Sequence, residues 1–214
     1  MKINLEQRTQ DWYTHRQKYI NATEIGSITG LDPFRTREQL VRDKLFGTTF
    51  QTNKYVEYGN QMEPIARQFI EKQLNLTFTP VIFIDDQYQR FSASLDGYND
   101  QTKTLLEIKC PYVDADNQIS STWTLFLANP CEKTIPLYYW AQVQCQLFCS
   151  QAKFGYFLVY FTATFFHVVK VTLNSAFIEK MAQASEVYLN LLTNAKKELA
   201  QSTYLKTLTK VKLF

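Results

Sequence analysis

The hydrophobic residues of this chain change their spacing part-way along the sequence. Before residue 75 they recur every three or four positions, most clearly over residues 59–74, which is typical of amphipathic helices. From residue 79 they gather in short runs bounded by polar turns, which is typical of strands. One helix is expected to begin near residues 21–24. The spacing predicts further helices over residues 11–19, 37–45, 59–74, 137–149 and 176–199, and strands over residues 79–84, 91–95, 103–110, 155–161 and 165–173.

This order of elements predicts a mixed fold. Helices come first, three consecutive strands follow, and another helix separates these from two more strands. We therefore expect an α/β (α+β mixed) protein whose central mixed β-sheet is flanked by helices. Residues 1–214 are expected to form one domain. Within it, residues 1–10 would be a loosely held polar arm, residues 117–136 a long irregular segment, and residues 174–214 a C-terminal helix and tail.

Composition narrows the class of protein without indicating a function. Hydrophobic residues make up 45% of the chain, which is enough for a sizeable core. Lysine and arginine outnumber aspartate and glutamate by 23 − 20 = 3, so nucleic-acid binding would have to come from a local patch. The four cysteines lack CxxC or zinc-site spacing, and no apolar run reaches about 18 residues. We therefore expect a cytoplasmic protein with free thiols and no membrane span.

The stretch over residues 94–111 holds the most informative combination of charges. Asp96 precedes Glu107 and Lys109, which lie two residues apart in a predicted strand and so point to the same side, while Ile108 points into a core. Carboxylates suit Mg²⁺ or Mn²⁺, and a lysine beside such a cation suits metal-dependent phosphodiester cleavage. The alternative is a solvated hairpin with charges on its outer face. Charges that interrupt a buried strand, however, usually have a partner or a metal.

Five short motifs follow one another along the chain, and each is weak by itself. They are Arg16 followed by Asn21-Ala22-Thr23-Glu24-Ile25-Gly26, then Gly59-Asn60 with Glu63-Pro64 and Ala66-Arg67, then Ser94-Leu95-Asp96-Gly97, then Leu106-Glu107-Ile108-Lys109-Cys110-Pro111, and finally Tyr139-Trp140-Ala141-Gln142-Val143-Gln144. As an ordered set, covering roughly residues 10–165, they are specific. The set resembles the PD-(D/E)XK nuclease superfamily and, within it, the phage lambda exonuclease-like (YqaJ-type) viral recombinases.

The resemblance implies a restriction-endonuclease-like core that binds a metal ion. Asp96, Glu107 and the backbone carbonyl of Ile108 match the positions that would bind Mg²⁺, for which Mn²⁺ would be a substitute. Glu63 would lie nearby and bind the ion through water or hold a second ion. These four residues are the expected metal ligands.

The resemblance also implies roles toward the reacting phosphate and the DNA end. Lys109 would orient the attacking water and stabilise charge on the phosphorus, with Gln142 supporting it from a neighbouring helix. Use of Lys109 as a proton acceptor would favour an alkaline optimum. Arg16 and Thr23 fall where the family grips a 5′-phosphate, and Thr23 in place of the more usual serine keeps the hydroxyl donor. Leu95 replaces the proline that often precedes the aspartate, a position that shapes the backbone rather than the chemistry.

Three more residues are candidates for DNA binding. Arg35 and Arg37 follow the turn at residues 30–34, and they would either grip the DNA backbone or wedge between its strands. The alternative for both is a solvated helix start. Tyr139 lies three residues before Gln142 and would share its helix face.

The function implied is a Mg²⁺-dependent 5′→3′ exonuclease that degrades one strand of linear double-stranded DNA. It would leave a 3′ single strand for annealing-type homologous recombination of a phage or prophage. The resemblance further implies 5′-phosphorylated duplex ends as substrate, a ring-shaped homotrimer, a single-strand annealing protein as partner, and the cytoplasm of a bacterial host. Two alternatives stay open: a structure- or end-specific endonuclease of the same superfamily, and a non-catalytic DNA-end-binding module.

Overall fold

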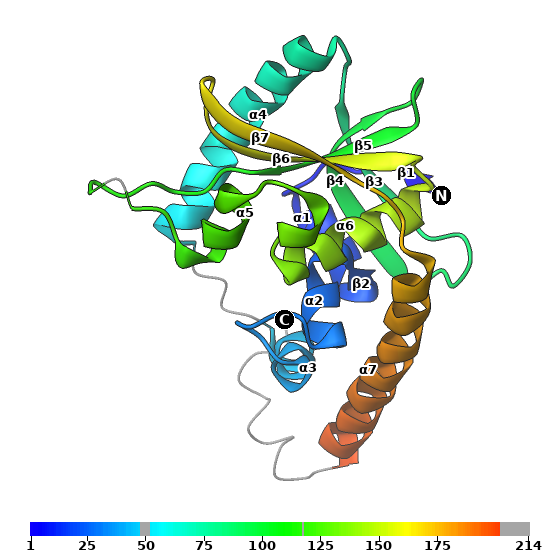
Figure 1. The fold of residues 1–214 in the computed structure, drawn as a ribbon. Coiled ribbons are helices and arrows are strands. Elements are labelled where there is room, and N and C mark those ends of the chain that lie inside the picture. Colours follow the sequence, from blue (N-terminus) through cyan, green and yellow to red (C-terminus); the bar gives the residue numbers. More distant parts are fainter. Residues whose placement is uncertain (48–51, 117, 202–214) are drawn as a thin grey trace.

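A seven-stranded mixed β-sheet forms the centre of the protein (Figure 1). The computed structural model describes residues 1–47, 52–116 and 118–201. The strand order is β1-β3-β4-β5-β6-β7, and β2 pairs with β4 beside this path. The strands are β1 (Lys2–Ile3), β2 (Ile20–Asn21), β3 (Thr79–Ile84), β4 (Phe91–Asn99), β5 (Thr104–Lys109), β6 (Phe154–Thr162) and β7 (Phe165–Val171).

Helices cover both faces of this sheet. In Figure 1, α4 lies above the sheet and α6 below it, with α2, α3 and α7 packed further out on the α6 side. The α-helices are α1 (Gln10–Lys18), α2 (Ile25–Thr29), α3 (Arg37–Phe46), α4 (Lys54–Leu74), α5 (Thr124–Ala128), α6 (Leu137–Ser150) and α7 (Ser175–Gln201). Three short 3₁₀ turns, η1 (Ala22–Glu24), η2 (Ser121–Trp123) and η3 (Glu132–Thr134), precede α2, α5 and α6 respectively.

The pairing of the strands makes the sheet mixed. Neighbouring strands are antiparallel except for two parallel pairs, β5 with β6 and β2 with β4. Parallel neighbours need a long crossover, and the connection between β5 and β6 carries α5 and α6. The predicted mixed fold, a central mixed sheet flanked by helices, is confirmed.

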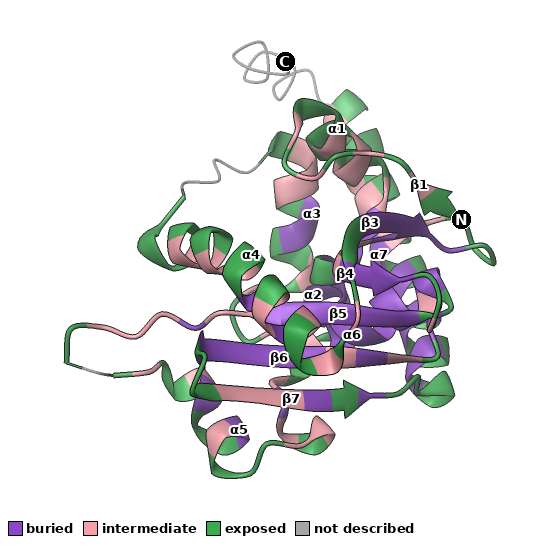
Figure 2. Ribbon diagram, turned by 90° about the horizontal axis from the view of Figure 1, so that it is seen from above, coloured by how far each residue is buried: buried purple, intermediate pink, exposed green. Residues whose placement is uncertain are grey.

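Strand β5 separates two hydrophobic cores. Leu105 faces the larger core on the α6 side, whereas Leu106 and Ile108 face the smaller core under α4. Burying each of these side chains stabilises the fold by about 1.5–3 kcal/mol. Figure 2 shows that the central strands are buried along most of their length. Because side chains alternate along a strand, Glu107 lies on the α6 side, opposite Ile108.

Helix α4 begins earlier than the hydrophobic spacing predicted. It starts at Lys54 rather than near residue 59, because the side chain of Asn53 accepts hydrogen bonds from the backbone N–H groups of Tyr55 and Val56. This cap satisfies two N–H groups that have no partner inside the helix. The added turn places Tyr55 and Tyr58 on a regular helix.

The first ten residues are held in place, so the expectation of a loosely held arm was wrong. Lys2 and Ile3 pair with β3, and the N-terminal ammonium group donates a hydrogen bond to the carbonyl of Ile84 at 2.6 Å. Gln7 Nε2 donates to the carbonyl of Leu95 at 2.9 Å. The segment is polar in sequence, but the edge of the sheet offers unpaired N–H and C=O groups at β3, and Lys2 and Ile3 pair with them.

Residues 118–136 are more regular than the sequence predicted, because they contain η2, α5 and η3. Residue 117 of the predicted irregular segment, and residues 202–214 of the predicted C-terminal helix and tail, lie outside the described residues. Trp123 and Phe126 are buried and anchor residues 118–136 to the larger core. Across the part of the chain that is described, no helix is long and apolar enough to cross a membrane.

Candidate active site

Strands β4 and β5 pair over a short length and then separate. Residues 97–99 of β4 pair with residues 104–106 of β5, whereas Phe91 and Ser92 at the start of β4 pair with β2 instead. Side chains bridge the opening. Gln146 Nε2 donates to the carbonyl of Ser94 at 3.1 Å, which satisfies a backbone group on the freed edge of β4. We call this opening, formed by residues 94–96 and 107–109, the β4–β5 fork.

Asp96 closes the inner end of the fork. Its Oδ2 atom accepts a hydrogen bond of 2.7 Å from the backbone N–H of Ile108, so a carboxylate replaces the missing backbone partner. Burial raises the pKa of Asp96 well above its usual range, and the negative charges of Glu107 and Glu63 raise it further. Burial and the two neighbouring carboxylates thus disfavour the charged form of Asp96, and a cation bound beside it would favour that form.

Glu107 is almost fully buried and accepts hydrogen bonds on both carboxylate oxygens. Oε1 accepts from Lys109 Nζ at 2.5 Å and from Gln142 Nε2 at 2.6 Å. Oε2 accepts from Gln146 Nε2 at 2.6 Å. These donors hold the charged carboxylate inside the protein, which would be costly without them.

Lys109 lies between acidic, polar and aromatic groups. Besides Glu107, its Nζ atom donates to Gln142 Oε1 at 3.4 Å and lies 4.5 Å from the centre of the Tyr139 ring. Burial by itself would lower the pKa of Lys109, but the charges of Glu107, Tyr139 and Asp96 outweigh it and raise the pKa. Lys109 is therefore a cation at neutral pH, fixed by three partners, and its raised pKa opposes the expected use of Lys109 as a proton acceptor.

Helix α6 supplies the polar side chains that reach the fork. Gln142 and Gln146 are both buried and lie four residues apart, one helical turn, so they share a face. The sequence analysis identified Gln142 but missed Gln146. Its signal was the same spacing: a second glutamine one turn further along a helix that is otherwise largely apolar on that side.

Glu63 lies on α4 near the fork but pairs with arginines. Arg8 contacts one of its carboxylate oxygens and Arg67 contacts the other. The pocket between the N-terminal segment and α4, with a volume of about 390 Å³, is lined by all three side chains. Arg8 adopts a left-handed backbone conformation (φ 69°) that places its side chain here. In this arrangement Glu63 faces cationic side chains, and it influences Asp96 only through its charge.

Arg16 and Thr23, the predicted 5′-phosphate residues, lie side by side. Arg16 Nη2 donates to Thr23 Oγ1 at 2.9 Å, and the guanidinium carbon lies 4.6 Å from the centre of the Trp12 ring. Burial lowers the pKa of Arg16, and the nearby charge of Arg35 also lowers it. The structure therefore brings a guanidinium and a hydroxyl group together between the C-terminal end of α1 and η1.

Arg35, in the turn between α2 and α3, and Arg37, the first residue of α3, both donate hydrogen bonds to α2. Arg35 Nε donates to Ser27 Oγ at 3.1 Å, and Arg37 Nε donates to the carbonyl of Ile28 at 3.0 Å. Ser27 follows Thr23 by four residues, about one turn along η1 and α2, so Arg35 lies on the side of Thr23 and Arg16. Of the two, Arg35 is the one placed to act together with Arg16.

The sequence of this chain matches a known protein family over most of its length. Residues 11–153 match the model of the YqaJ-like viral recombinase domain. The chain belongs to this family. It is 27% identical over 158 residues to an uncharacterized protein of Acanthamoeba polyphaga mimivirus, a match that covers 68% of this chain and 27% of that protein. The chain thus spans about a quarter of the length of that curated relative.

The fold of this YqaJ-like domain is similar to that of solved exonucleases. An alkaline exonuclease (LHK-Exo) from Laribacter hongkongensis superposes with a TM-score of 0.69 at 21% identity, over 90% of this chain and 97% of that one. The same enzyme has been solved in complex with dAMP. A phage-related exonuclease from Haemophilus somnus 129PT gives a TM-score of 0.63 at 15% identity, over 85% of this chain and 96% of that one. At these identities the likeness establishes the shared fold.

The donor set of the YqaJ-like domain fits a hard divalent cation in part. Asp96 and Glu107 offer carboxylate oxygens, and the charge around Asp96 favours a cation. Glu63 would first have to leave Arg8 and Arg67 to join them. Consistent with that, no group of three His, Cys, Asp or Glu residues close enough to hold a metal occurs among residues 1–47, 52–116 and 118–201.

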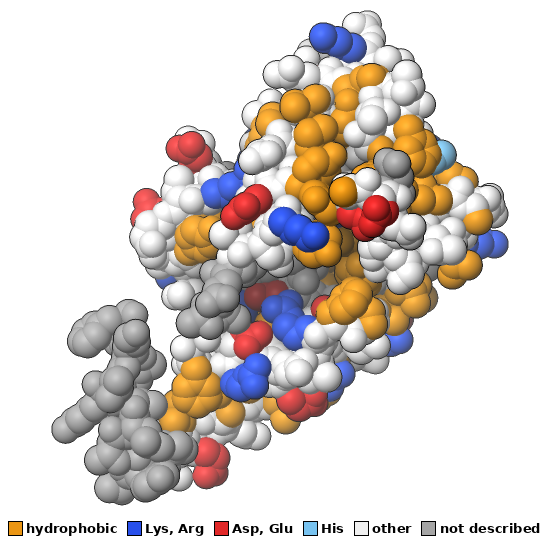
Figure 3. Space-filling view, turned by 90° about the vertical axis from the view of Figure 1, so that its left-hand side faces the viewer, with side chains coloured by type: hydrophobic (Ala, Val, Ile, Leu, Met, Phe, Trp, Pro, Cys, Tyr) orange, Lys and Arg blue, Asp and Glu red, His pale blue; other side chains and the backbone are white. Residues whose placement is uncertain are grey.

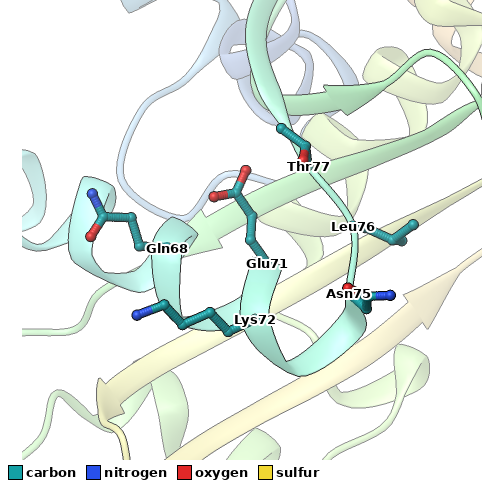
Figure 4. A pocket seen from close by; sticks show the side chains of 6 residues that line it. All are labelled: Gln68, Glu71, Lys72, Asn75, Leu76 and Thr77. Carbon is teal, nitrogen blue, oxygen red and sulfur yellow. The ribbon is translucent and has the colours of Figure 1, made fainter.

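One face of the molecule is hollowed. Figure 3 shows the face at the left-hand side of Figure 1, where basic and acidic side chains gather in a hollow bordered by apolar ones. A separate pocket of about 350 Å³ lies at the C-terminal end of α4 (Figure 4). Its acidic residue, Glu71, already accepts a hydrogen bond from the backbone N–H of Phe78. That pocket offers no comparable cluster of reactive groups.

Proposed function

We propose that this protein is a Mg²⁺-dependent deoxyribonuclease that degrades one strand of linear double-stranded DNA from its 5′ end. The observation that carries the proposal is the contact of Lys109 with Glu107 beside Asp96 in the β4–β5 fork. Membership of the viral recombinase family and the exonuclease fold support it. The remaining 3′ single strand would serve annealing-type recombination.

In this proposal Asp96, Glu107 and the carbonyl of Ile108 hold the cation, for which Mn²⁺ can substitute. A divalent cation at such a site activates water and offsets the charge of the phosphate. Lys109, charged and fixed by Gln142, stabilises the negative charge that develops on the phosphate oxygens. Water attacks the phosphorus and the bond to the 3′ oxygen breaks. The phosphate then stays on the next nucleotide as a new 5′ end.

The 5′→3′ polarity comes from the resemblance to the family, and in this proposal the arginines near the end of α1 would account for it. Arg16 and Arg35 would bind the new terminal phosphate through charge-assisted hydrogen bonds, with the hydroxyl group of Thr23 as a further donor. Arg37, whose Nε atom is bonded to the backbone, and Tyr139, under the ammonium group of Lys109, would border the path of the strand. Binding at this position makes 5′-phosphorylated ends the preferred substrate.

Three further properties belong to the proposal through the family. They are assembly into a ring-shaped homotrimer, cooperation with a single-strand annealing protein, and action in the cytoplasm of a bacterial host. Light scattering on the purified protein tests the first: a trimer mass supports it, and a monomer mass contradicts it. Co-purification with a single-strand annealing protein tests the second: a stable complex supports it, and separate elution contradicts it.

The activity is tested with linear duplex DNA labelled at either the 5′ or the 3′ end, in the presence of Mg²⁺. Asp96→Asn removes the carboxylate charge at nearly constant size, and Asp116→Asn, an exposed aspartate, is the matched control. Early release of the 5′ label as mononucleotide, with the 3′ label retained and only Asp96→Asn inactive, supports the proposal. A closed circular duplex is tested in parallel, and its cleavage would indicate an endonuclease. Binding of the linear duplex ends without cleavage would indicate a non-catalytic module.

A further inference from the structure

Three tyrosines and a lysine form a cluster beside the fork. Tyr112 follows Lys109 by three residues, and its ring centre lies 5.6 Å from that of Tyr55 and 5.5 Å from that of Tyr58, with nearly perpendicular planes. Lys54 Nζ lies 5.2 Å from the centre of the Tyr55 ring and 4.9 Å from that of Tyr112. We call these four residues the tyrosine–lysine surface.

Local structure fixes this surface in advance of any ligand. Tyr55 and Tyr58 are three residues apart on α4 and share a helix face. The capping of α4 by Asn53 orders the turn that carries them. On the other side, the buried Pro111 holds the chain as it leaves β5, so that Tyr112 meets the two helical tyrosines. The tyrosine side chains therefore lose little conformational freedom when a ligand binds, which lowers the entropic cost of binding.

The outer side of this surface faces solvent. Tyr55 is 57% exposed, Lys54 is exposed, and Tyr58 and Tyr112 are half-buried. Within the described chain, none of the four belongs to either hydrophobic core. Packing of the core therefore does not explain why three tyrosines lie at this place. The exposed ring of Tyr55, next to the ammonium group of Lys54, is available for binding.

The surface continues directly into the candidate active site. Cys110 follows Lys109, and it packs against the smaller core together with Met62, which lies one turn after Tyr58 on α4. Tyr112 is connected to Lys109 by only two residues of extended chain. A DNA strand that places a phosphate in the fork would carry its adjoining bases close to these rings.

We propose that the tyrosine–lysine surface binds the unpaired bases of the DNA strand that enters the β4–β5 fork. The inference rests on the proposed function and adds a base-binding subsite to it. Aromatic rings beside a cationic group are how proteins hold single-stranded nucleic acid without sequence preference, since every base has a flat face to stack. Lys54 would pair with the backbone phosphate. A lysine among the rings also disfavours a dry protein interface, from whose centre charged residues are depleted.

The test is the binding of a short fluorescein-labelled oligo(dT) and of a duplex of equal length, measured by fluorescence anisotropy in EDTA so that no cleavage occurs. Tyr55→Ala and Tyr112→Ala each remove one ring, and Tyr55→Phe keeps the ring without its hydroxyl group. Tyr88→Ala is the matched control, because Tyr88 lies in the β3–β4 turn against Phe148. Tyr55 is exposed, so its replacement leaves the fold intact.

Tyr55→Ala and Tyr112→Ala are expected to bind the oligo(dT) about tenfold more weakly, with duplex binding unchanged. Tyr55→Phe and Tyr88→Ala should bind like the wild type. The inference would be overturned if Tyr55→Ala bound the oligo(dT) as tightly as the wild type, or if it lost equal affinity for the oligo(dT) and the duplex. A lower particle mass of Tyr55→Ala in light scattering would also overturn it, because that result would indicate an interface between copies of the chain. Selective oligo(dT) binding without any cleavage in Mg²⁺ would refute the proposed function and leave the base-binding surface standing.

Discussion

Gln146 and Glu107 are joined by a buried hydrogen bond of 2.6 Å between Nε2 and Oε2. The same Nε2 atom also donates to the carbonyl of Ser94 at 3.1 Å. One side chain of α6 thus links the acid on β5 to the backbone of β4, on the two sides of the fork. Its Oε1 atom is buried and has no hydrogen-bond donor in the described part of the structure. Gln146 therefore orients Glu107 without needing to touch the substrate.

Gln146→Ala is expected to raise the Mg²⁺ concentration needed for half-maximal cleavage by about tenfold, since residues that orient metal ligands typically contribute 10–100-fold to affinity or activity. Saturating Mg²⁺ should restore much of the rate, which separates a positioning role from direct catalysis. Mg²⁺ titrations of the cleavage rate measure both. Gln183→Ala, on the exposed side of α7, is the control, and an unchanged Mg²⁺ dependence of Gln146→Ala would contradict the role.

Arg16→Gln is expected to abolish the preference for phosphorylated 5′ ends. Loss of a hydrogen bond to a charged group costs about 1.5–3 kcal/mol, which corresponds to roughly ten- to a hundredfold in kcat/KM. The measurement compares cleavage of duplexes with 5′-phosphate and 5′-hydroxyl ends. Arg42→Gln, an exposed arginine of α3, should keep the preference. If Arg16→Gln still prefers the phosphorylated end, the phosphate is bound elsewhere.

Lys44→Met is expected to destabilise the fold by about 3–5 kcal/mol, because it leaves the buried carboxylate of Glu24 without its cation. Lys44 Nζ lies 2.9 Å from Glu24 Oε1, and both side chains are largely buried. The double variant Glu24→Gln with Lys44→Met should recover part of the loss, since no buried charge remains. Urea unfolding followed by circular dichroism measures each free energy. Equal stability of the single and double variants would show that the pair is not coupled.

Cys131 should be the first cysteine to react with iodoacetamide near neutral pH. A hydrogen bond with Thr134 lowers the pKa of Cys131, so more of it is thiolate. Burial, with the charges of Asp96 and Glu63, raises the pKa of Cys110 to about 12, and burial also raises the pKa of Cys149. Peptide mass spectrometry over time gives the order of labelling. Faster labelling of Cys110 would mean that the fork is more open than described.

The sequence predicted the elements better than the contacts between them. Alternation along β5 was enough to place Glu107 and Lys109 on one side and Ile108 on the other, because a strand has a fixed period of two. The nearness of Asp96 and Gln142 to these residues came only from the resemblance, because periodicity carries no information about which elements pack together. The family membership itself was predicted correctly.

Other features of the site depend on long-range contacts that no local pattern indicates. The partner of Glu63, Arg8, is 55 residues away and lies in a segment expected to be loose. Lys2 and Ile3 form a strand only because the edge of β3 is open beside them. Gln146 was overlooked because a glutamine on a helix is usually solvated, and its burial follows from how α6 packs over the fork.

The most direct test of the account is cleavage of 5′-labelled linear duplex DNA in Mg²⁺ by the wild type, Lys109→Ala and Lys180→Ala. Lys180 is an exposed lysine of α7, so its replacement controls for loss of general positive charge. The account predicts that Lys109→Ala loses at least about a hundredfold in rate, as expected when a charge-stabilising group is removed, while binding to DNA ends in EDTA is retained and Lys180→Ala cleaves normally. Cleavage by Lys109→Ala at the wild-type rate would contradict it.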